Sequence, residues 1–282
     1  MKRSAGVLMP ISSLPSKYGI GTLGKGARDF IDFLEKSGQT YWQVLPIGPT
    51  GYGDSPYQSF SSNAGNPYFI DLDDLCDEGY LEKEEYVNEN YGTDVNCVDY
   101  SQIYNTRFTV LRKAVERLSA VQPEDYLSFL RDNAYWLNDY ALFMAEKDDH
   151  KGQAYTTWEE DIRKHDTKTL ENERVRLQKN VEFYLGLQYF FFHQWKKMRE
   201  YGRKHGVYLI GDVPIYVSSD SSDIWGNPEF FQLDEDMKLT GVAGCPPDAF
   251  SADGQLWGNP LYNWDKMKDD DYTWWVNRVR YQ

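Results

Sequence analysis

Cysteine is scarce in this sequence of 282 residues, which has only Cys76, Cys97 and Cys245. They are widely spaced and form no Cys-x-x-Cys pair, a pattern that fits a reducing compartment better than a disulfide framework. No apolar run approaches the ~20 residues of a membrane span. The apolar run near the N-terminus stops at Pro10 and Ile11, too short for a signal-peptide core. We therefore expect a soluble cytoplasmic protein with no membrane partner.

Positive charge is also in short supply, since 30 Lys and Arg face 44 Asp and Glu and leave a net charge of −14. Such a chain repels polyanions, so we expect no nucleic-acid partner. Histidine is rare as well. His150, His165, His193 and His205 form no His-Glu-x-x-His motif and no cluster with cysteine, so we predict no metal site. Aromatic residues, in contrast, make up 16% of the chain, which suits a cleft whose rings face a sugar.

Short apolar runs alternate with helical patterns along the chain. We expect buried strands at Gly6–Ile11, Tyr41–Leu45 and Val207–Ile210, and helices near 27–36, 103–118, 123–143, 180–205 and 272–281. A strand, a helix and a strand in succession give parallel, adjacent strands. The length allows one barrel or two smaller domains, and the alternation predicts an α/β protein with a parallel sheet or a (β/α)₈ barrel.

A glycine-rich loop follows the first expected strand and has the spacing of a dinucleotide-binding fingerprint. Its glycines are Gly19, Gly21 and Gly24, in the pattern G-x-G-x-x-G. A true fingerprint follows its strand directly and is paired with an acidic residue at the end of the second strand. Here seven residues, among them Pro15, separate the strand from the glycines, and the second strand ends in Leu45-Pro46-Ile47. We therefore predict no nicotinamide or flavin cofactor.

The segment from Gln39 to Leu72 is the most informative part of the sequence. After the expected strand it becomes rich in Gly and Pro, and within Gly51–Gln58 it reads GYGDSPYQ. Aromatic side chains such as Tyr52 and Tyr57 alternate there with short hydroxyl, amide and carboxylate groups. Sugars stack their C–H faces on rings and need both donors and acceptors, so this composition favours a sugar site. A turn-rich surface loop has a similar composition and stays open as the alternative.

Three stretches in this order resemble a known family. They are QVLPIGPTGYGDSPYQSFSSNAGNPYFIDL at 43–72, GDVPIYV at 211–217 and PPDAFSADGQLWGNPLY at 246–262. They are similar to the signatures of the 4-α-glucanotransferases, also called amylomaltases or disproportionating enzymes, of glycoside hydrolase family 77. Between about Leu75 and Asn180 the resemblance is loose.

The resemblance implies the N-terminal portion of a (β/α)₈ TIM-barrel fold with helical and loop insertions. Four segments are then expected: residues 1–74 with the first barrel strands and a cleft loop, 75–179 as an inserted helical subdomain, 180–217 with a barrel helix and the third strand, and 218–282 with a cleft-covering loop region and a following helix. The region 218–264 itself is loop-like in sequence, without clear periodicity. The barrel is expected to be incomplete at residue 282, because a closed barrel needs about eight strands.

The activity that the resemblance implies is transfer of α-1,4-glucan segments between maltodextrins by a retaining double displacement, without a cofactor. Its partners would be α-1,4-glucans and maltooligosaccharides, while the sequence predicts no oligomeric state. Positions that match the family's motifs are implied to bind substrate: Asp54, Ser55, Tyr57, Asp212, Asp248, Gln255, Trp257 and Asn259. From its position alone Asp212 could equally be a turn or cap aspartate, and Phe250 could be a packing residue.

The resemblance assigns no catalytic residue to this chain. The family's nucleophile belongs to an Arg-x-Asp-His pattern on the fourth barrel strand, and no Arg-x-Asp occurs in this sequence. We expect residues 1–282 to be part of a longer enzyme and to be inactive alone. The alternative is a non-catalytic glucan-binding protein that is complete at 282 residues.

Overall fold

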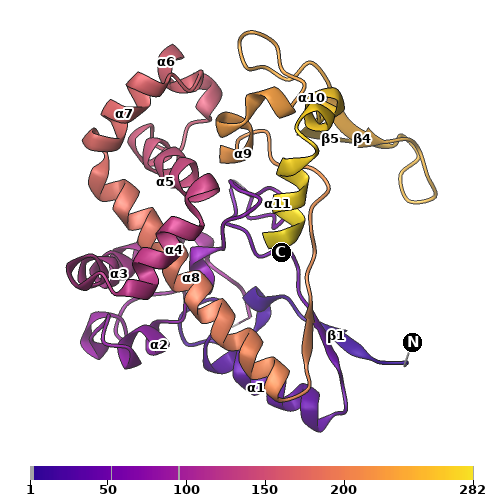
Figure 1. The fold of residues 1–282 in the computed structure, drawn as a ribbon. Coiled ribbons are helices and arrows are strands. Elements are labelled where there is room, and N and C mark those ends of the chain that lie inside the picture. Colours follow the sequence, from indigo (N-terminus) through magenta and orange to yellow (C-terminus); the bar gives the residue numbers. More distant parts are fainter. Residues whose placement is uncertain (1–2, 52, 95, 282) are drawn as a thin grey trace. The chain divides into compact units, whose positions relative to one another are not determined.

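The computed structural model describes residues 3–51, 53–94 and 96–281. The chain forms two compact units (Figure 1). Unit 1 comprises Met1–Pro49, Gly65–Ala134 and Glu182–Asp212, and unit 2 comprises Thr50–Ala64, Tyr135–Val181 and Val213–Gln282. The four segments expected from the sequence are a division by role in the family's fold, and they stay a prediction.

A parallel three-stranded sheet lies in unit 1. Its strands are β1 (Gly6–Leu8), β2 (Tyr41–Gln43) and β3 (Tyr208–Ile210), in the spatial order β1-β2-β3. Gly6 aligns with Tyr41, and Tyr41 with Tyr208. A Cβ at Gly6 would lie 2.5 Å from the carbonyl oxygen of Tyr41, so only glycine fits there. With helix α1 (Lys25–Lys36) between β1 and β2, the expected strand–helix–strand unit and the α/β class are confirmed.

The expectation that all these strands are buried is wrong for β1 and β3. On the middle strand Trp42 is fully buried, packs its ring 5.0 Å from that of Phe30 on α1, and donates Nε1–H to the Met9 carbonyl. Leu8 on β1 is 52% exposed, and Tyr208 and Ile210 on β3 are also exposed. The reason is that these residues share one face of the sheet: Leu8 aligns with Gln43 of β2 and Gln43 with Ile210, and Gln43 is exposed as well, whereas Trp42 points to the opposite face, where Phe30 of α1 packs on it.

Unit 1 is completed by helices. They are η1 (Ile11–Ser13), η2 (Pro67–Phe69), α2 (Leu72–Asp77), η3 (Lys83–Glu85), α3 (Tyr100–Val121), α4 (Glu124–Asp132) and most of α8 (Gln178–Lys204). The helices expected near 103–118 and 180–205 are confirmed. The single helix expected at 123–143 is wrong, because α4 stops at Asp132 and α5 (Ala134–Asp149) follows. Asn133 separates them: it closes α4 by donating Nδ2–H to the Phe129 carbonyl.

The glycine-rich loop before α1 has a packing role. A Cβ at Gly21 would lie 1.8 Å from the Ile11 carbonyl oxygen, and one at Gly24 would lie 2.1 Å from Asp71 Cγ. Asp71 is buried there, accepts a hydrogen bond from the Thr22 hydroxyl, and caps α2 by accepting from the Asp74 amide. The glycines therefore serve close contacts of the loop, with η1 at Gly21 and with the start of α2 at Gly24.

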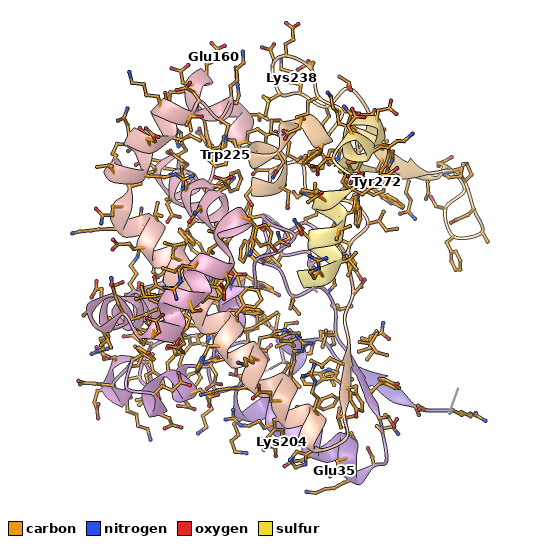
Figure 2. All side chains as sticks on the ribbon, in the orientation of Figure 1. Glu35, Glu160, Lys204, Trp225, Lys238 and Tyr272 are labelled. Atoms are coloured by element: carbon orange, nitrogen blue, oxygen red, sulfur yellow. The ribbon has the colours of Figure 1, made fainter. Side chains whose placement is uncertain are left out.

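Unit 2 contains the remaining elements. They are α5 from Tyr135 onward, η4 (Tyr155–Thr157), α6 (Glu160–Arg163), α7 (Thr167–Arg176), α9 (Ser222–Gly226), η5 (Pro228–Phe230), β4 (Val242–Cys245), β5 (Gln255–Pro260), α10 (Trp264–Asp269) and α11 (Thr273–Tyr281). Its core is aromatic: Trp225 is fully buried (Figure 2), contacts Phe143 and Trp158, and donates Nε1–H to the Ile162 carbonyl. The loop-like reading of 218–264 needs correction, because this region holds α9 and the antiparallel pair β4–β5.

No helix in the described ranges has the length and apolarity needed to cross a bilayer.

Two glutamines of α8 fix the end of the Gln39–Leu72 segment. Gln188 accepts from the Gly65 amide at 2.8 Å and donates to its carbonyl at 3.0 Å. Gln194, further along α8, does the same with the amide and carbonyl of Asp71, at 2.7 and 3.0 Å. All four residues are buried, so these bonds satisfy backbone groups that water cannot reach.

This pairing predicts a large loss of stability in Gln188→Leu. The substitution leaves the buried amide and carbonyl of Gly65 unpaired, at a cost of about 1–3 kcal/mol each. We expect the free energy of unfolding, measured by urea denaturation, to fall by about 2–4 kcal/mol. Lys196→Leu, at an exposed position on the same helix, serves as the control and should change it by less than about 0.5 kcal/mol. Equal stability of the two variants would contradict this role of Gln188.

Candidate functional site

The expected sugar-binding motif Gly51–Gln58 forms a tight loop in unit 2. Thr50 and Ser59 pair across its base, and the Gly51 amide donates to the Gln58 carbonyl at 3.3 Å. Asp54 lies at the turn with a φ of 52°, a conformation that favours glycine, while Thr50 Oγ1 donates to Asp54 Oδ1 at 3.5 Å. Burial raises the pKa of the Asp54 carboxyl above its ordinary value.

The same loop presents Tyr57 to solvent. Its side chain is 45% exposed, and its backbone amide donates to Ser55 Oγ at 3.3 Å. One turn therefore brings together the expected binding residues Asp54, Ser55 and Tyr57. Tyr52, which the sequence placed in the same aromatic set, lies outside the described residues.

The β4–β5 hairpin carries the second group of expected residues. Asp248 organises its tip, because Oδ1 accepts from the amides of Phe250 and Ser251, both at 2.8 Å. Phe250 is 97% exposed, so the alternative that it packs into a core is wrong. On β5, Gln255 Oε1 accepts from Trp257 Nε1–H at 3.0 Å, which fixes the orientation of an indole that is 45% exposed. The Tyr216 ring lies 6.2 Å from it.

The last two expected residues differ from this pattern. Asn259 is only 7% exposed and donates Nδ2–H to the Val217 carbonyl at 2.7 Å, so its amide supports the turn after β3. Asp212 belongs to unit 1, whereas the other seven expected residues belong to unit 2. It lies two residues past Ile210, the last residue of β3, and is partly exposed. The binding roles of all eight residues stay predictions.

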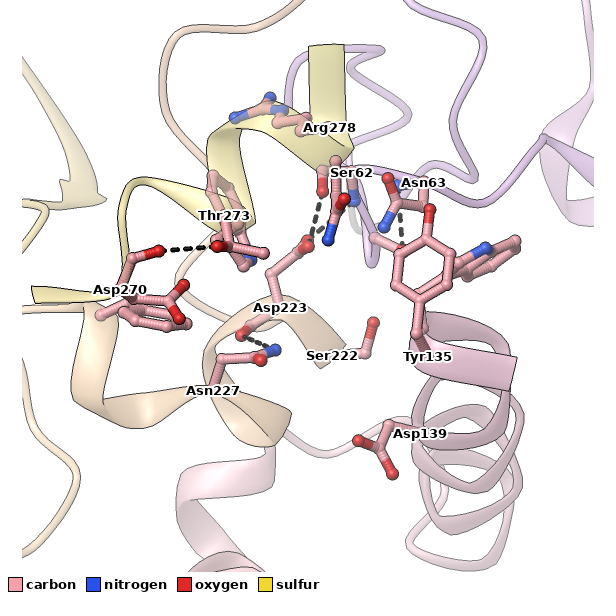
Figure 3. Close-up of a pocket in the computed structure, with 15 residues that line it drawn as sticks. Ser62, Asn63, Tyr135, Asp139, Ser222, Asp223, Asn227, Asp270, Thr273 and Arg278 are labelled. Atoms are coloured by element: carbon pink, nitrogen blue, oxygen red, sulfur yellow. Dashed lines mark hydrogen bonds between the residues drawn. The ribbon is translucent and has the colours of Figure 1, made fainter. Parts of the chain in front are cut away.

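Sequence reasoning missed a polar cavity within unit 2, which Figure 3 shows. It has a volume of about 290 Å³ and is lined from the loop after the motif, from α5, from α9 and from α11. Asp223 on α9 is buried in its wall, where Oδ1 accepts from the Ser62 hydroxyl at 2.6 Å and Oδ2 from the Ser62 amide at 2.7 Å. Burial raises the pKa of Asp223. Ser62 and Asp223 are 161 residues apart, so no local pattern signals their contact.

A second carboxylate, Asp139 on α5, also lines this cavity. Arg174 on α7 donates to its Oδ1 at 2.9 Å, and His165 Nε2 lies 3.6 Å from the same oxygen. Burial raises the pKa of Asp139, but His165 and Arg174 outweigh that effect and the net pKa is below its ordinary value. Asp139 is therefore an ionised group whose charge the protein itself balances.

Another cluster that the sequence did not reveal lies at the end of α5. Ligand atoms of Glu146, Asp149 and His150 are all within 4.8 Å of one another. The cluster already contains a cation, because Arg176 on α7 bonds to Asp149 at 2.9 Å and lies 3.7 Å from Glu146 Oε2. Its guanidinium already balances carboxylate charge in this cluster. Neither carboxylate oxygen of the fully buried Glu146 has a hydrogen-bond partner among the described residues.

This cluster predicts a pH dependence of stability. Burial and the neighbouring Glu173 raise the pKa of Glu146 to about 7, above the roughly 4.3 of an unfolded chain. The folded state then holds a proton that the unfolded state has lost, so stability falls as the pH rises from about 4.5 to about 7. The pKa of His150 is lowered by burial but raised on balance by Glu159, and its contribution is likewise lost as pH rises.

Glu146→Gln should remove the largest part of this effect. At pH 8 we expect the variant to be more stable than the unchanged protein, by on the order of 1 kcal/mol in free energy of unfolding, and to melt at a higher temperature. At pH 5 the two should melt at nearly the same temperature. Glu171→Gln, at an exposed position on α7, is the control and should shift neither melt. A stabilisation of Glu146→Gln that is equal at both pH values would show that the raised pKa is not its cause.

Comparison with known proteins places the chain in a family. The family model described as 4-alpha-glucanotransferase matches residues 9–282. A 4-alpha-glucanotransferase of Clostridium butyricum is 47% identical over 273 residues, which are 96% of this chain and 56% of that protein. One of Streptococcus pneumoniae is 48% identical over 281 residues, 99% of this chain and 56% of its own length. The chain thus spans little more than half the length of these relatives.

Solved structures agree. The amylomaltase from Streptococcus agalactiae, in complex with acarbose, superposes with a TM-score of 0.94 at 43% identity, covering 99% of this chain and 57% of the other. The amylomaltase from Corynebacterium glutamicum, at 19% identity and a TM-score of 0.75 over 99% of this chain and 39% of its own, shows likeness of fold alone. With the family model matching nearly its whole length, this chain belongs to the 4-alpha-glucanotransferase family, glycoside hydrolase family 77.

Proposed function

We propose that the protein transfers α-1,4-glucan segments between maltodextrins by a retaining double displacement, and that residues 1–282 supply glucan-binding groups to this reaction. The observation that carries the proposal is the pair of half-exposed rings, Tyr57 and Trp257, on the two loops that match the family's motifs. The Trp257 ring is held by its hydrogen bond to Gln255, and the backbone at Tyr57 is held by the bond of its amide to Ser55. Exposed rings are what a glucose unit needs for stacking, and a ring that is already held in place, as at Trp257, loses little conformational entropy on binding.

Polar groups beside these rings suit sugar hydroxyls. Asp248 is exposed, and its Oδ1 is engaged by backbone amides while its Oδ2 accepts from none of the described residues. A glucan hydroxyl can donate to Oδ2. Asp54, with its raised pKa, and Asp212 are proposed to make similar contacts. The substrates follow from this chemistry and from the family: α-1,4-glucans and maltooligosaccharides.

The proposed fold of the protein is a (β/α)₈ barrel to which β1, β2 and β3 contribute. The TM-score of 0.94 with an amylomaltase supports this proposal. We also propose a cytoplasmic location, which three free cysteines support. In the family's mechanism one carboxylate attacks the anomeric carbon and another protonates the leaving oxygen, roughly 5–5.5 Å apart. Neither role is assigned to a residue of this chain, because no Arg-x-Asp sequence occurs in it.

The proposal is tested by joining to residue 282 the part of the Clostridium butyricum relative that continues beyond the match. Incubated with maltotriose, the chimera should release glucose and form longer oligosaccharides, as thin-layer chromatography would show. Residues 1–282 alone should bind maltotriose without turnover. Hydrolysis with no longer products would contradict the transfer reaction, and a folded chimera without any turnover would favour the glucan-binding alternative.

Removing either proposed stacking ring should weaken binding. An aromatic contact of this kind contributes on the order of 1 kcal/mol, so Tyr57→Ala and Trp257→Ala should each raise the dissociation constant for maltoheptaose about fivefold. Phe33→Ala, an exposed ring on α1 outside the motifs, is the matched control and should leave it unchanged. If Tyr57→Ala instead keeps the affinity and lowers the melting temperature by many degrees, the ring serves packing.

A further inference from the structure

The loop that carries Tyr57 is held in unit 2 by the start of helix α9. Ser222 donates twice to the Phe60 carbonyl, from its amide at 2.9 Å and from its hydroxyl at 3.0 Å. Asp223 accepts from both the amide and the hydroxyl of Ser62, at 2.7 and 2.6 Å (Figure 3). Both α9 residues are 6% exposed, so these bonds are shielded from water. They fix the backbone of the residues that follow Tyr57 along the chain.

Side-chain bonds carry this anchoring back toward Tyr57. Ser59 Oγ donates to the Ser61 carbonyl at 2.8 Å and accepts from the Ser61 amide at 3.3 Å, which fixes the turn before Ser62. Ser59 also pairs with Thr50 across the base of the loop. Because the backbone between Tyr57 and Ser62 is bonded in this way, a displacement of Ser62 displaces the backbone at Tyr57 as well.

The chain that leads into α9 is fixed from its other side by the segment of the β4–β5 hairpin. Asn259, two residues after Trp257 on β5, donates Nδ2–H to the Val217 carbonyl at 2.7 Å. Just after the hairpin, the Tyr262 hydroxyl donates to the Ile215 carbonyl at 2.8 Å. Asn259 and Tyr262 are both buried. The start of α9 therefore connects the two loops that carry the exposed rings, through hydrogen bonds that all lie within unit 2.

The position of Asp223 in its helix does not by itself account for this contact. An aspartate in the first turn of a helix commonly interacts with the positive end of that helix. Here the helix has only five residues, Ser222–Gly226. Both oxygens of the Asp223 carboxylate instead bind Ser62, which lies 161 positions away in the sequence. The carboxylate therefore serves the loop that carries Ser62.

We propose that Asp223 is a positioning residue for glucan binding: by holding Ser62, it keeps the ring of Tyr57 where a glucan contacts it. The inference rests on the proposed function, because it requires that Tyr57 binds glucan. Asp223 itself does not touch the glucan, since it is buried and both its oxygens are engaged. Loss of its carboxylate should weaken binding only through Tyr57, whereas Trp257, oriented by Gln255, keeps its own contribution.

Calorimetric titration of residues 1–282 with maltoheptaose in two backgrounds tests this role. In the unchanged protein, Tyr57→Ala should weaken binding about fivefold. In a protein that already carries Asp223→Ala, the same substitution should weaken binding less than about twofold, because the backbone under the ring is no longer fixed. Trp257→Ala should weaken binding about fivefold in both backgrounds. Circular dichroism melts show that each variant is folded before it is titrated.

Three other backgrounds sharpen the test. In Asp223→Asn the side-chain oxygen can accept from the Ser62 amide and the side-chain nitrogen can donate to the Ser62 hydroxyl, so the effect of Tyr57→Ala should return to about fivefold. Ser62→Ala keeps the bond from its amide, and there the effect should be about threefold. Glu229→Ala removes an exposed carboxylate from η5 and is the charge-matched control, with an effect of about fivefold.

The outcomes separate this inference from the proposed function. If Tyr57→Ala still weakens binding about fivefold in Asp223→Ala, or in Ser62→Ala where Asp223→Ala does not fold, the inference is overturned and the proposed function stands. Equal loss of the Tyr57 and Trp257 contributions in Asp223→Ala would also overturn it, because Asp223 would then support the fold in general. An unchanged affinity of Tyr57→Ala in the otherwise unchanged protein would overturn both the inference and the stacking role of Tyr57.

Discussion

The structure depends on how α8 holds the backbone at the end of the motif segment. Gln188 makes two hydrogen bonds to the buried backbone of Gly65, one with its amide and one with its carbonyl, and Gln194 does the same with Asp71. At the other end β2 is fixed as the central strand, and the Asn66 amide donates to the Ile47 carbonyl at 2.8 Å. Within unit 1 the residues before and after the Tyr57 loop, Ile47 and Asn66, are therefore hydrogen-bonded neighbours.

Most buried charged groups of this acidic protein are held by hydrogen bonds, whereas neither carboxylate oxygen of Glu146 has a hydrogen-bond partner among the described residues. Arg107 is fully buried and donates to the carbonyls of Tyr18 and Ile70; burial lowers its pKa to about 10. Lys147 is buried and donates to Asp220 and to two carbonyls. Asp223 is held by Ser62. Each of these groups exchanges water for fixed partners, which is the condition for burying charge without a large penalty.

Much of the fold could be predicted from local patterns. The three strands and the helices α1 and α8 follow from apolar periodicity, and the motif loop followed from its residue composition. The strand ends and the exposure of Leu8 could not be predicted, because they depend on which strands pair and on which face of the sheet other elements cover. The hairpin β4–β5 was missed since its residues, rich in Gly and Pro, show no alternation.

For the sites, the limit is sequence distance. Trp257 and Gln255 are two residues apart, and the motif that contains them could be recognised in the sequence. The cavity joins Asn63, Asp139, Asp223 and Arg278 from four separate segments. No periodicity links such positions, and each residue alone has the appearance of an ordinary cap or surface group.

The central claim is that the motif loops of this chain bind glucan, and hydrogen–deuterium exchange with and without maltoheptaose tests it most directly. Bound glucan should slow exchange of backbone amides in residues 50–59 and 246–259, while α3, at Tyr100–Val121, exchanges at the same rate in both samples. Protection of α3 with no change in the two loops, or no protection anywhere at saturating maltoheptaose, would contradict the account.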